Sequence, residues 1–432
     1  MKKFFLILII LLGVLTIFAS DISGKIENDF RLFVFEKNIF MDKFYVDMEY
    51  KKNFNEKFDF NLCLQIESDY PFFIKNIEDM TEKENFYKNL FKIYEAKIFL
   101  KKFPFDFVDL TLGKTFYNLG KGFVVSPSDI VNSDDLSDPL RMDKKVTNFM
   151  VLLESYFKFF DLNIIYTPFF TPSILPDGYI DFKDYMGNLN IKDSIILPEN
   201  IFQNSDFFVE FLKDINNFQT SFFYGYSRTK TPLPSNIKLE MVTPFSGFGD
   251  VKFNFPRISS FGLGFSGAFG DFSLWSDFVG NFLNENRFKI DLTEIGRGVV
   301  DTFFAKEKIF FNFLLGFDFN ISGKYYFMTQ YVHGIRGTYG EENLNDYLFF
   351  NSRISFLNEK IFVEPFNFAY EIVDWKEIKS QGGILFNPKI TLNLMDDFSI
   401  GFSFFYIKGT SGSYFKKIEK LSCFELTTKV FF

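Results

Sequence analysis

The stretch FDFNLCLQIE, Phe58–Glu67, alternates apolar and polar side chains without a break. Its apolar members are Phe58, Phe60, Leu62, Leu64 and Ile66; its polar members are Asp59, Asn61, Cys63, Gln65 and Glu67. A period of two places the two sets on opposite faces of a β-strand. In a soluble sandwich the apolar face would pack on a second sheet. In a membrane barrel it faces lipid while the polar face lines a watery lumen, and this stretch is about as long as a tilted strand that crosses a bilayer.

The same alternation recurs along the chain and predicts 18 strands. They are 25–35, 44–51, 58–67, 94–100, 107–116, 147–158, 161–169, 206–212, 218–226, 251–268, 272–281, 309–319, 324–333, 346–356, 361–372, 382–394, 398–408 and 420–432. The connections between them alternate short and long, as in an antiparallel up-and-down barrel with turns at one end and loops at the other. Residues 227–250 read as loop and 284–306 are ambiguous. Either segment can contain another hairpin, so 16 or 20 strands remain alternatives.

Composition favours the membrane barrel over the sandwich. Aromatic residues make up 21% of the chain, with 69 Phe against 2 Trp. So much Phe is hard to bury in one soluble core, which also needs aliphatic and small residues, whereas a lipid-facing surface accepts it. A general compositional bias toward Phe contributes to the excess but does not create alternation.

The first twenty residues have the pattern of a secretory signal peptide. Lys2 and Lys3 precede the apolar run Phe4–Phe18, and Ala19 and Ser20 are small enough for cleavage. We therefore expect residues 1–20 to be removed and residues 21–432 to form one outer-membrane barrel domain, with both termini and the short turns in the periplasm. The alternative for this segment is an uncleaved membrane anchor.

Charge and rare residues exclude several functions. The net charge is −8, and removing the two signal lysines makes it about −10, which argues against nucleic acid as a partner. Cys63 and Cys423 are too few for a disulfide framework. His333 is the only histidine, and no His/Cys cluster or phosphate-binding loop is present. We expect neither an enzyme nor a bound metal or cofactor.

The segment Gly113–Lys145 carries the most distinctive motif in the chain. Gly113, Lys114, Gly120, Gly122, Phe123, Pro127, Asp129, Asn132, Asp135, Asp138, Pro139 and Arg141 occur in an order that resembles a motif of bacterial outer-membrane barrels of the porin and alginate-export type. Leu119 stands where the motif has Trp, and Ser128 separates the usual Pro-Asp pair. The resemblance covers about thirty residues, and it implies a barrel family more than any particular substrate.

Long loops that fold into a barrel narrow the pore and set its charge selectivity. The candidate constriction residues of this loop are Lys114, Lys121, Asp129, Asn132, Asp134, Asp135, Asp138 and Arg141. If the loop folds inward, Asp134, Asp135 and Asp138 are expected to oppose Lys114, Lys121 and Arg141, and neutralising the three acids should favour anions. The alternative is an exposed loop whose acids only satisfy backbone donors.

The sequence therefore predicts an outer-membrane channel for passive passage of small hydrophilic solutes. The alternative is a plugged export or structural barrel without general pore activity. Lipid is the expected environment, and the alternating strand that ends at Phe432 resembles the C-terminal strand that barrel-insertion machinery reads. The sequence leaves the solute and the oligomeric state open.

Overall fold

The computed structural model describes residues 22–35, 40–70, 92–175, 189–199, 202–243, 246–378 and 380–432. The expected signal peptide lies outside these residues. Within them, no helix has the length and apolarity of a membrane span. The helix α3 (Tyr414–Lys417) has only one turn.

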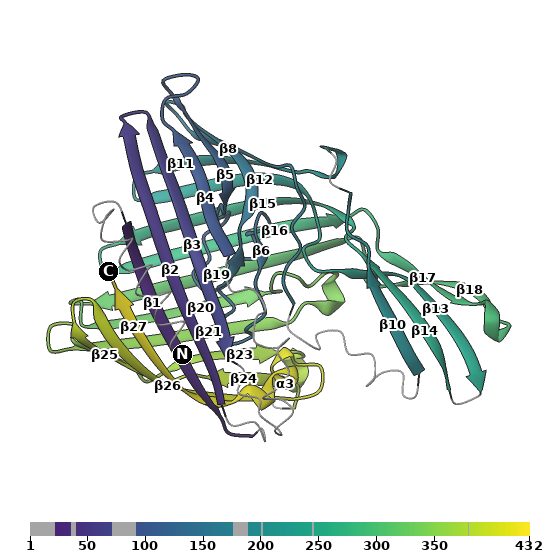
Figure 1. Ribbon diagram of the computed structural model, residues 1–432. Coiled ribbons are helices and arrows are strands. Elements are labelled where there is room, and N and C mark those ends of the chain that lie inside the picture. The colour runs from purple at the N-terminus through teal and green to yellow at the C-terminus, as the bar shows by residue number, and fades with distance from the viewer. Residues whose placement is uncertain are drawn as a thin grey trace, which may run out of the picture.

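The main sheet is a closed antiparallel barrel of 18 strands, which confirms the predicted fold and strand number (Figure 1). Its strands are β1 (Ile22–Phe33), β2 (Phe40–Asn55), β3 (Phe58–Tyr70), β4 (Lys92–Leu100), β5 (Val108–Thr115), β8 (Asn148–Tyr156), β9 (Asp161–Thr167), β11 (Asp206–Ile215), β12 (Phe218–Arg228), β15 (Arg257–Phe269), β16 (Phe272–Leu283), β19 (Ile309–Ile321), β20 (Tyr325–His333), β21 (Asp346–Phe356), β22 (Ile361–Glu364) with β23 (Asn367–Ile372), β24 (Gly382–Phe386) with β25 (Lys389–Met395), β26 (Phe398–Gly409) and β27 (Cys423–Phe431). Pairing of β1 with β27 closes the barrel and leaves no free edge.

Two of the predicted strands are each interrupted by a proline. Pro365 separates β22 from β23, and Pro388 separates β24 from β25. Proline has no N–H for the ladder, so a strand breaks or bulges where it occurs. The four pieces still pair in order, β21 with both β22 and β23, and β26 with both β24 and β25.

Inner and outer faces follow the predicted alternation. Along β19 the side chains at Ile309, Phe311, Phe313, Leu315 and Phe317 are exposed, and those between them are buried. On the stretch Phe58–Glu67 the polar parity faces its neighbours on β2: Asn61 donates to Glu49 at 2.9 Å, and Gln65 donates to Asp47 at 2.9 Å. The side chain of Glu67 lies outside the described part.

The segments that the sequence left as loop and as ambiguous do contain hairpins, but these do not enter the barrel. Residues 233–254 form β13 (Leu233–Thr243) and β14 (Ser246–Asn254), and residues 287–303 form β17 (Arg287–Leu292) and β18 (Gly298–Phe303). With β10 (Leu189–Ile195) they make a separate five-stranded sheet that projects from the long-loop end (Figure 1). The alternatives of 16 or 20 barrel strands are therefore wrong.

The expected single strand 251–268 is wrong for the same reason. Its first residues belong to β14 of the projecting sheet, and Phe255 and Pro256 separate them from β15. The carbonyl of Pro256 accepts the Thr229 N–H at 3.0 Å, but its nitrogen has no hydrogen to donate. The chain therefore changes sheets at this proline.

Candidate lumen loop

The segment 116–147 between β5 and β8, which we call the lumen loop, runs through the barrel interior and is held by several walls. It contains a short ladder, β6 (Ser133–Asp134) with β7 (Lys145–Val146). Near its start the Tyr117 hydroxyl donates to the Glu210 carboxylate of β11 and accepts from Asn163 Nδ2 of β9 at 2.6 Å. Burial and the neighbouring Glu210 raise the pKa of Tyr117, so this phenol remains a neutral donor.

A carboxylate on β16 holds the first bend of the loop. Both oxygens of Asp277 accept the Lys121 N–H, at 3.0 and 2.9 Å, and Oδ2 also accepts the Ser126 hydroxyl at 2.8 Å. Gly120 has φ +97°, and an added Cβ there would lie 2.4 Å from the Ser126 oxygen. A glycine is required at this position, since other residues rarely adopt that φ and no space remains for a side chain.

An amide on β20 holds the next residues. Gln330 accepts the Phe123 N–H at 2.9 Å and donates to the Val125 carbonyl at 2.9 Å. The indole N–H of Trp275 donates to the same Gln330 oxygen at 3.0 Å. Gln330 is fully buried, and these bonds attach the loop backbone to the wall like a short piece of β-ladder.

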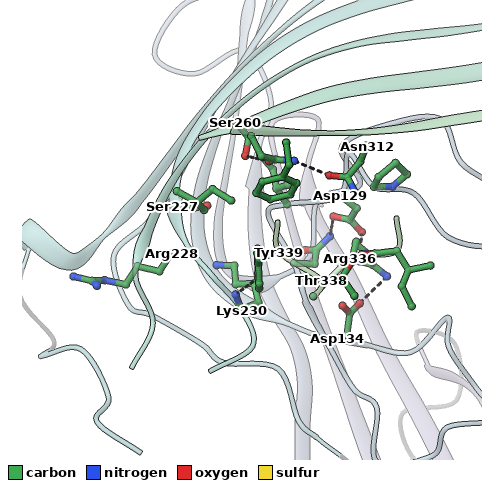
Figure 2. Close-up of a pocket in the computed structure, with 18 residues that line it drawn as sticks. Asp129, Asp134, Ser227, Arg228, Lys230, Ser260, Asn312, Arg336, Thr338 and Tyr339 are labelled. Carbon is green, nitrogen blue, oxygen red and sulfur yellow. Dashed lines mark hydrogen bonds and ion pairs between the residues drawn. The ribbon is translucent and has the colours of Figure 1, made fainter. Parts of the chain in front are cut away.

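Arg336, from the connection between β20 and β21, forms ion pairs with the middle of the loop (Figure 2). Its Nη1 lies 3.1 Å from Asp129 Oδ2, and its Nη2 lies 2.6 Å from Asp134 Oδ1. Lys145 contacts the same Asp129 oxygen, and Asn132 Nδ2 donates to the other at 2.7 Å. Asp129, Asn132, Asp134 and Arg336 line a pocket between the loop and the wall of β15, β16 and β19.

Burial is the largest influence on Asp134 and raises its pKa to about 6, although Arg336 opposes the shift. Asp138 behaves in the opposite way. Burial alone would raise its pKa, but Arg31 and Lys43 outweigh that and hold the pKa well below its ordinary value. Two carboxyls of one loop therefore differ in how firmly they hold a negative charge.

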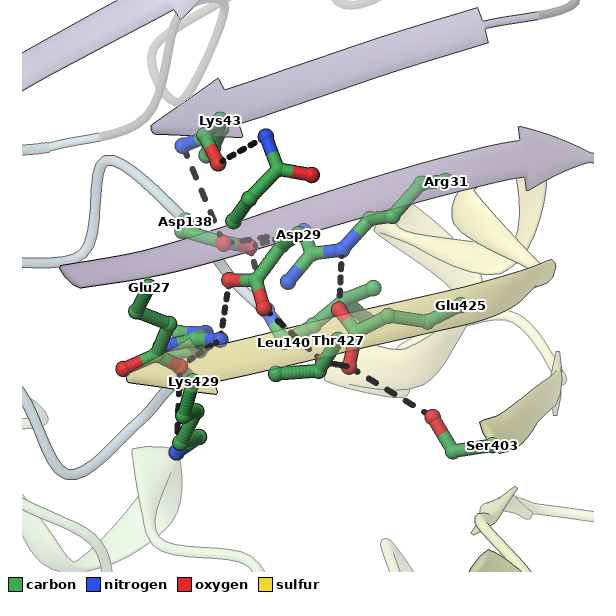
Figure 3. Close-up of polar contacts among 12 residues, drawn as sticks. Glu27, Asp29, Arg31, Lys43, Asp138, Leu140, Ser403, Glu425, Thr427 and Lys429 are labelled. Atoms are coloured by element: carbon green, nitrogen blue, oxygen red, sulfur yellow. Dashed lines mark hydrogen bonds and ion pairs between the residues drawn. The ribbon is translucent and has the colours of Figure 1, made fainter. Parts of the chain in front are cut away.

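The end of the loop meets the seam where the first and last strands pair (Figure 3). Arg31 of β1 contacts Asp138 Oδ2 at 2.8 Å, and Lys43 of β2 lies 3.7 Å from the same oxygen. Arg141 contacts Asp29 and lies 3.1 Å from Glu27, both on β1. The carboxylates of this cluster are almost fully buried, so each needs its cation.

Apolar side chains fill the space between these polar anchors. Leu119 and Val131 pack with Met150, Ile165 and Phe208 on one side of the loop. On the other side Val125 joins a larger cluster, whose members on the wall include Trp275, Leu314, Met328, Val332, Tyr347 and Phe349. The loop is thus packed as a core element across much of the interior.

Four of the candidate residues, Lys114, Lys121, Asn132 and Asp135, are not part of a constriction in which acids face bases. Lys114 lies opposite Phe149, whose neighbours Asn148 and Met150 face the loop, so Lys114 points to the outer side, where Nζ donates to the Ile93 carbonyl at 2.7 Å. Lys121 Nζ donates to Gln219 Oε1. Asp135 accepts the Ser137 N–H at 3.1 Å. Asn132 donates to the Tyr117 carbonyl at 2.7 Å and so closes the loop on itself.

Eight residues that hold the loop from outside it were not among the candidates that the sequence indicated. They are Glu27, Asp29, Arg31, Lys43, Glu210, Asp277, Gln330 and Arg336. Those of them that lie on strands occupy the polar face of an alternating strand. This pattern predicts that their side chains point into the barrel, but it does not predict which residues they contact. Among the described residues, no group of three His, Cys, Asp or Glu side chains is placed to hold a metal ion.

No protein-family model matches the sequence, and no curated protein matches it. Among solved structures, OpdK of Pseudomonas aeruginosa, solved with vanillate, has a TM-score of 0.50 at 8% identity, covering 95% of this chain and 97% of that one. OccK11 (OpdR) of the same species has a TM-score of 0.49 at 9% identity, covering 95% and 94%. OmpT, an outer-membrane protein of Vibrio cholerae, has 0.41 at 9% identity, covering 95% and 97%.

The likeness to OpdK is one of fold. It agrees with the closed 18-stranded sheet of this chain. The chain therefore has the fold of a porin-like β-barrel.

Proposed function

We propose that the barrel is a non-enzymatic channel through which small hydrophilic solutes pass without an energy source, with the lumen loop as its constriction. The observation that carries this proposal is the combination of a polar inner face with a loop that crosses it. Charged side chains with partial exposure, such as Asp47, Asp59 and Lys97, line the wall at the short-turn end. Water therefore reaches this end of the lumen, and a loop in its path limits the size of what passes.

The second candidate is a plugged export or structural barrel. The apolar packing on both sides of the lumen loop favours it, because a loop packed like a core leaves less room for solutes. The two candidates share one fold and differ in whether water is continuous past the loop.

Single-channel conductance in a planar bilayer separates the two. We expect the native barrel to give small, discrete current steps, and deletion of Ser133–Asp138 to raise the conductance. The deletion removes the contacts of Asp134 and Asp138 but no barrel strand. Heat-dependent mobility in SDS serves as the control for an assembled barrel. A silent native protein that conducts only after the deletion would establish the plugged barrel instead.

We also propose that the strand ending at Phe432 is the segment that barrel-insertion machinery reads. Phe432 and Gly24 exchange backbone hydrogen bonds, at 2.8 and 3.0 Å, which extends the seam between β27 and β1 to the end of the chain. Replacing Phe432 by Ser should lower the yield of barrel in the outer membrane more than it lowers refolding into detergent micelles.

A further inference from the structure

Arg31 takes part both in the seam of the barrel, where the first and last strands pair, and in the contacts that hold the lumen loop. In the register of β1 and β27 it lies opposite Glu425, and its Nε donates to Glu425 Oε2 at 2.6 Å. Its Nη1 donates to Asp138 Oδ1 at 2.9 Å. The side chain is 2% exposed, so the last strand and the loop share one buried cation (Figure 3).

The geometry orders these contacts into a relay. Glu425 touches Arg31, Ser403 and Thr427, and none of its hydrogen bonds within the described residues reaches the lumen loop. A guanidinium is planar with donors in a fixed fork, so a carboxylate on Nε orients the remaining donors. Glu425 therefore aims Nη1 of Arg31 at Asp138.

The contacts of the loop around Asp138 link the position of the Asp138 carboxylate to the position of the loop backbone. Asp138 accepts the Leu140 N–H at 3.2 Å through Oδ1, and its carbonyl accepts the Arg141 N–H at 3.0 Å. Arg141 then contacts Glu27 and Asp29, which lie four and two residues before Arg31 on the same strand. The turn 138–141 is thus attached to β1 at both ends.

We propose that Arg31, oriented across the seam by Glu425, is the positioning residue that sets where the lumen loop lies and hence how wide the passage is. The statement about width rests on the proposed channel function. The statement about loop position does not, and it can be tested without current measurements.

The test measures the loop position directly in the full-length barrel. Spin labels at Ser137, which is exposed beside Asp138, and at Lys51, which is exposed on β2, would be introduced in a Cys63→Ser, Cys423→Ala background. The distance between them would be read by pulsed electron paramagnetic resonance. We expect one narrow distance for the native side chains and a broadened, shifted distribution for Arg31→Met.

Two further variants separate positioning from general damage. Glu425→Gln should also broaden the distance, although Glu425 does not touch the loop, and Arg31→Lys should recover part of the native distribution. Lys101→Met is the matched control, because Lys101 pairs with Asp59 on the inner wall away from the loop; it should leave the distance unchanged. An unchanged distance in assembled Arg31→Met barrels would overturn the proposal.

Conductance gives the second readout. Arg31→Met should raise the single-channel conductance at least twofold or make it flicker between two levels. If no variant conducts, the channel function fails while the distances still decide the positioning role. If Arg31→Met does not assemble, Asp138→Asn removes the loop side of the contact alone, and an unchanged distance in that variant overturns the proposal equally.

Discussion

The inner face of the barrel carries charge in two different ways. On the seam wall of β27, β1 and β2, the buried acids Glu27, Asp29 and Glu425 each contact a cation. On the wall of β5, β8, β9 and β11, which we call the acidic wall, Asp109 lies directly opposite Glu154 in the register. The other acids on the inward parity of this wall are Asp161, Asp206, Glu210 and Asp214. Asp206, at the loop end of β11, pairs with Lys230 at 2.7 Å and with Arg257 at 3.0 Å.

The other five acids of the acidic wall have no matching set of cations. Within the described residues no ion pair joins Asp109, Glu154, Asp161, Glu210 or Asp214 to a basic side chain; Glu210 bonds Tyr117, and Asp214 accepts from Gln219. Paired charges in a buried wall hold protein segments together. Unpaired like charges cost stability, and their field extends into the lumen. The paired acids of the seam wall therefore hold the end of the loop, and Glu210 holds its start. If the barrel conducts as proposed, the unpaired acids of the acidic wall are the ones expected to act on passing ions.

The strongest way to break this comparison is to remove a cation from the seam wall. Arg141→Met leaves Asp29, which is fully buried, without its cation, and it should lower the free energy of unfolding by about 3–5 kcal/mol. Lys51→Met is the control: Lys51 pairs with Glu49 in an exposed position, so the change should stay below about 1 kcal/mol. Urea unfolding in lipid vesicles measures both. Equal effects would mean that burial of the pairs does not matter.

The comparison assumes that both walls face the lumen, which a charge on the outer face can check. Leu315 is 52% exposed on β19, and Leu315→Arg should cost about 2–4 kcal/mol if it lies near the bilayer midplane. Asp318→Arg, on the inner parity of the same strand, should cost less, because Asp318 is half-buried and its one hydrogen bond within the described residues is to Tyr326. The same unfolding measurement applies. A larger cost at Asp318 would reverse the assignment of faces.

A pH titration distinguishes Asp134 from the seam acids. The pKa of Asp134 is raised to about 6 from an ordinary 3.8, so its proton stabilises the folded state below pH 4, and that contribution is lost as the pH rises through 6. Between pH 5 and pH 7 the loss is about 1 kcal/mol. Asp134→Asn should flatten this slope.

Asp138 should show the opposite dependence. Its pKa is lowered, so its contribution is present above the ordinary pKa and disappears only in strong acid. Asp138→Asn should therefore lower stability throughout neutral pH while leaving the slope between pH 5 and pH 7 intact. A slope that survives in Asp134→Asn would assign it to another group.

The smallest effect on stability, with the clearest effect on ions, is expected at the acidic wall. Asp109→Asn with Glu154→Gln removes an opposed like-charge pair and should stabilise the barrel by about 0.2–1 kcal/mol. It should also shift the reversal potential in a KCl gradient toward anions, while Asp301→Asn on the projecting sheet should not. Neutralising Asp134, Asp135 and Asp138 should shift it less, since two of these acids already have cations.

Local pattern alone determined the barrel. Side-chain alternation depends only on the two-residue period of a strand, so it can be read in a stretch such as Phe58–Glu67. The lengths of the connections between such stretches indicate which strands are neighbours. The hairpins β13–β14 and β17–β18 carry the same alternation. Whether such a strand joins the barrel or a separate sheet depends on its pairing partner, which is not a local property.

The candidate site shows the same division. The sequence marked the loop through its glycines and acids, and Gly120 has the backbone conformation that a glycine permits. Only the tertiary structure decided that Asp138 meets Arg31, 107 residues away, and that Asp134 meets Arg336. An ion pair forms between whichever charges the closed barrel brings within reach, and closure is a property of all 18 strands together.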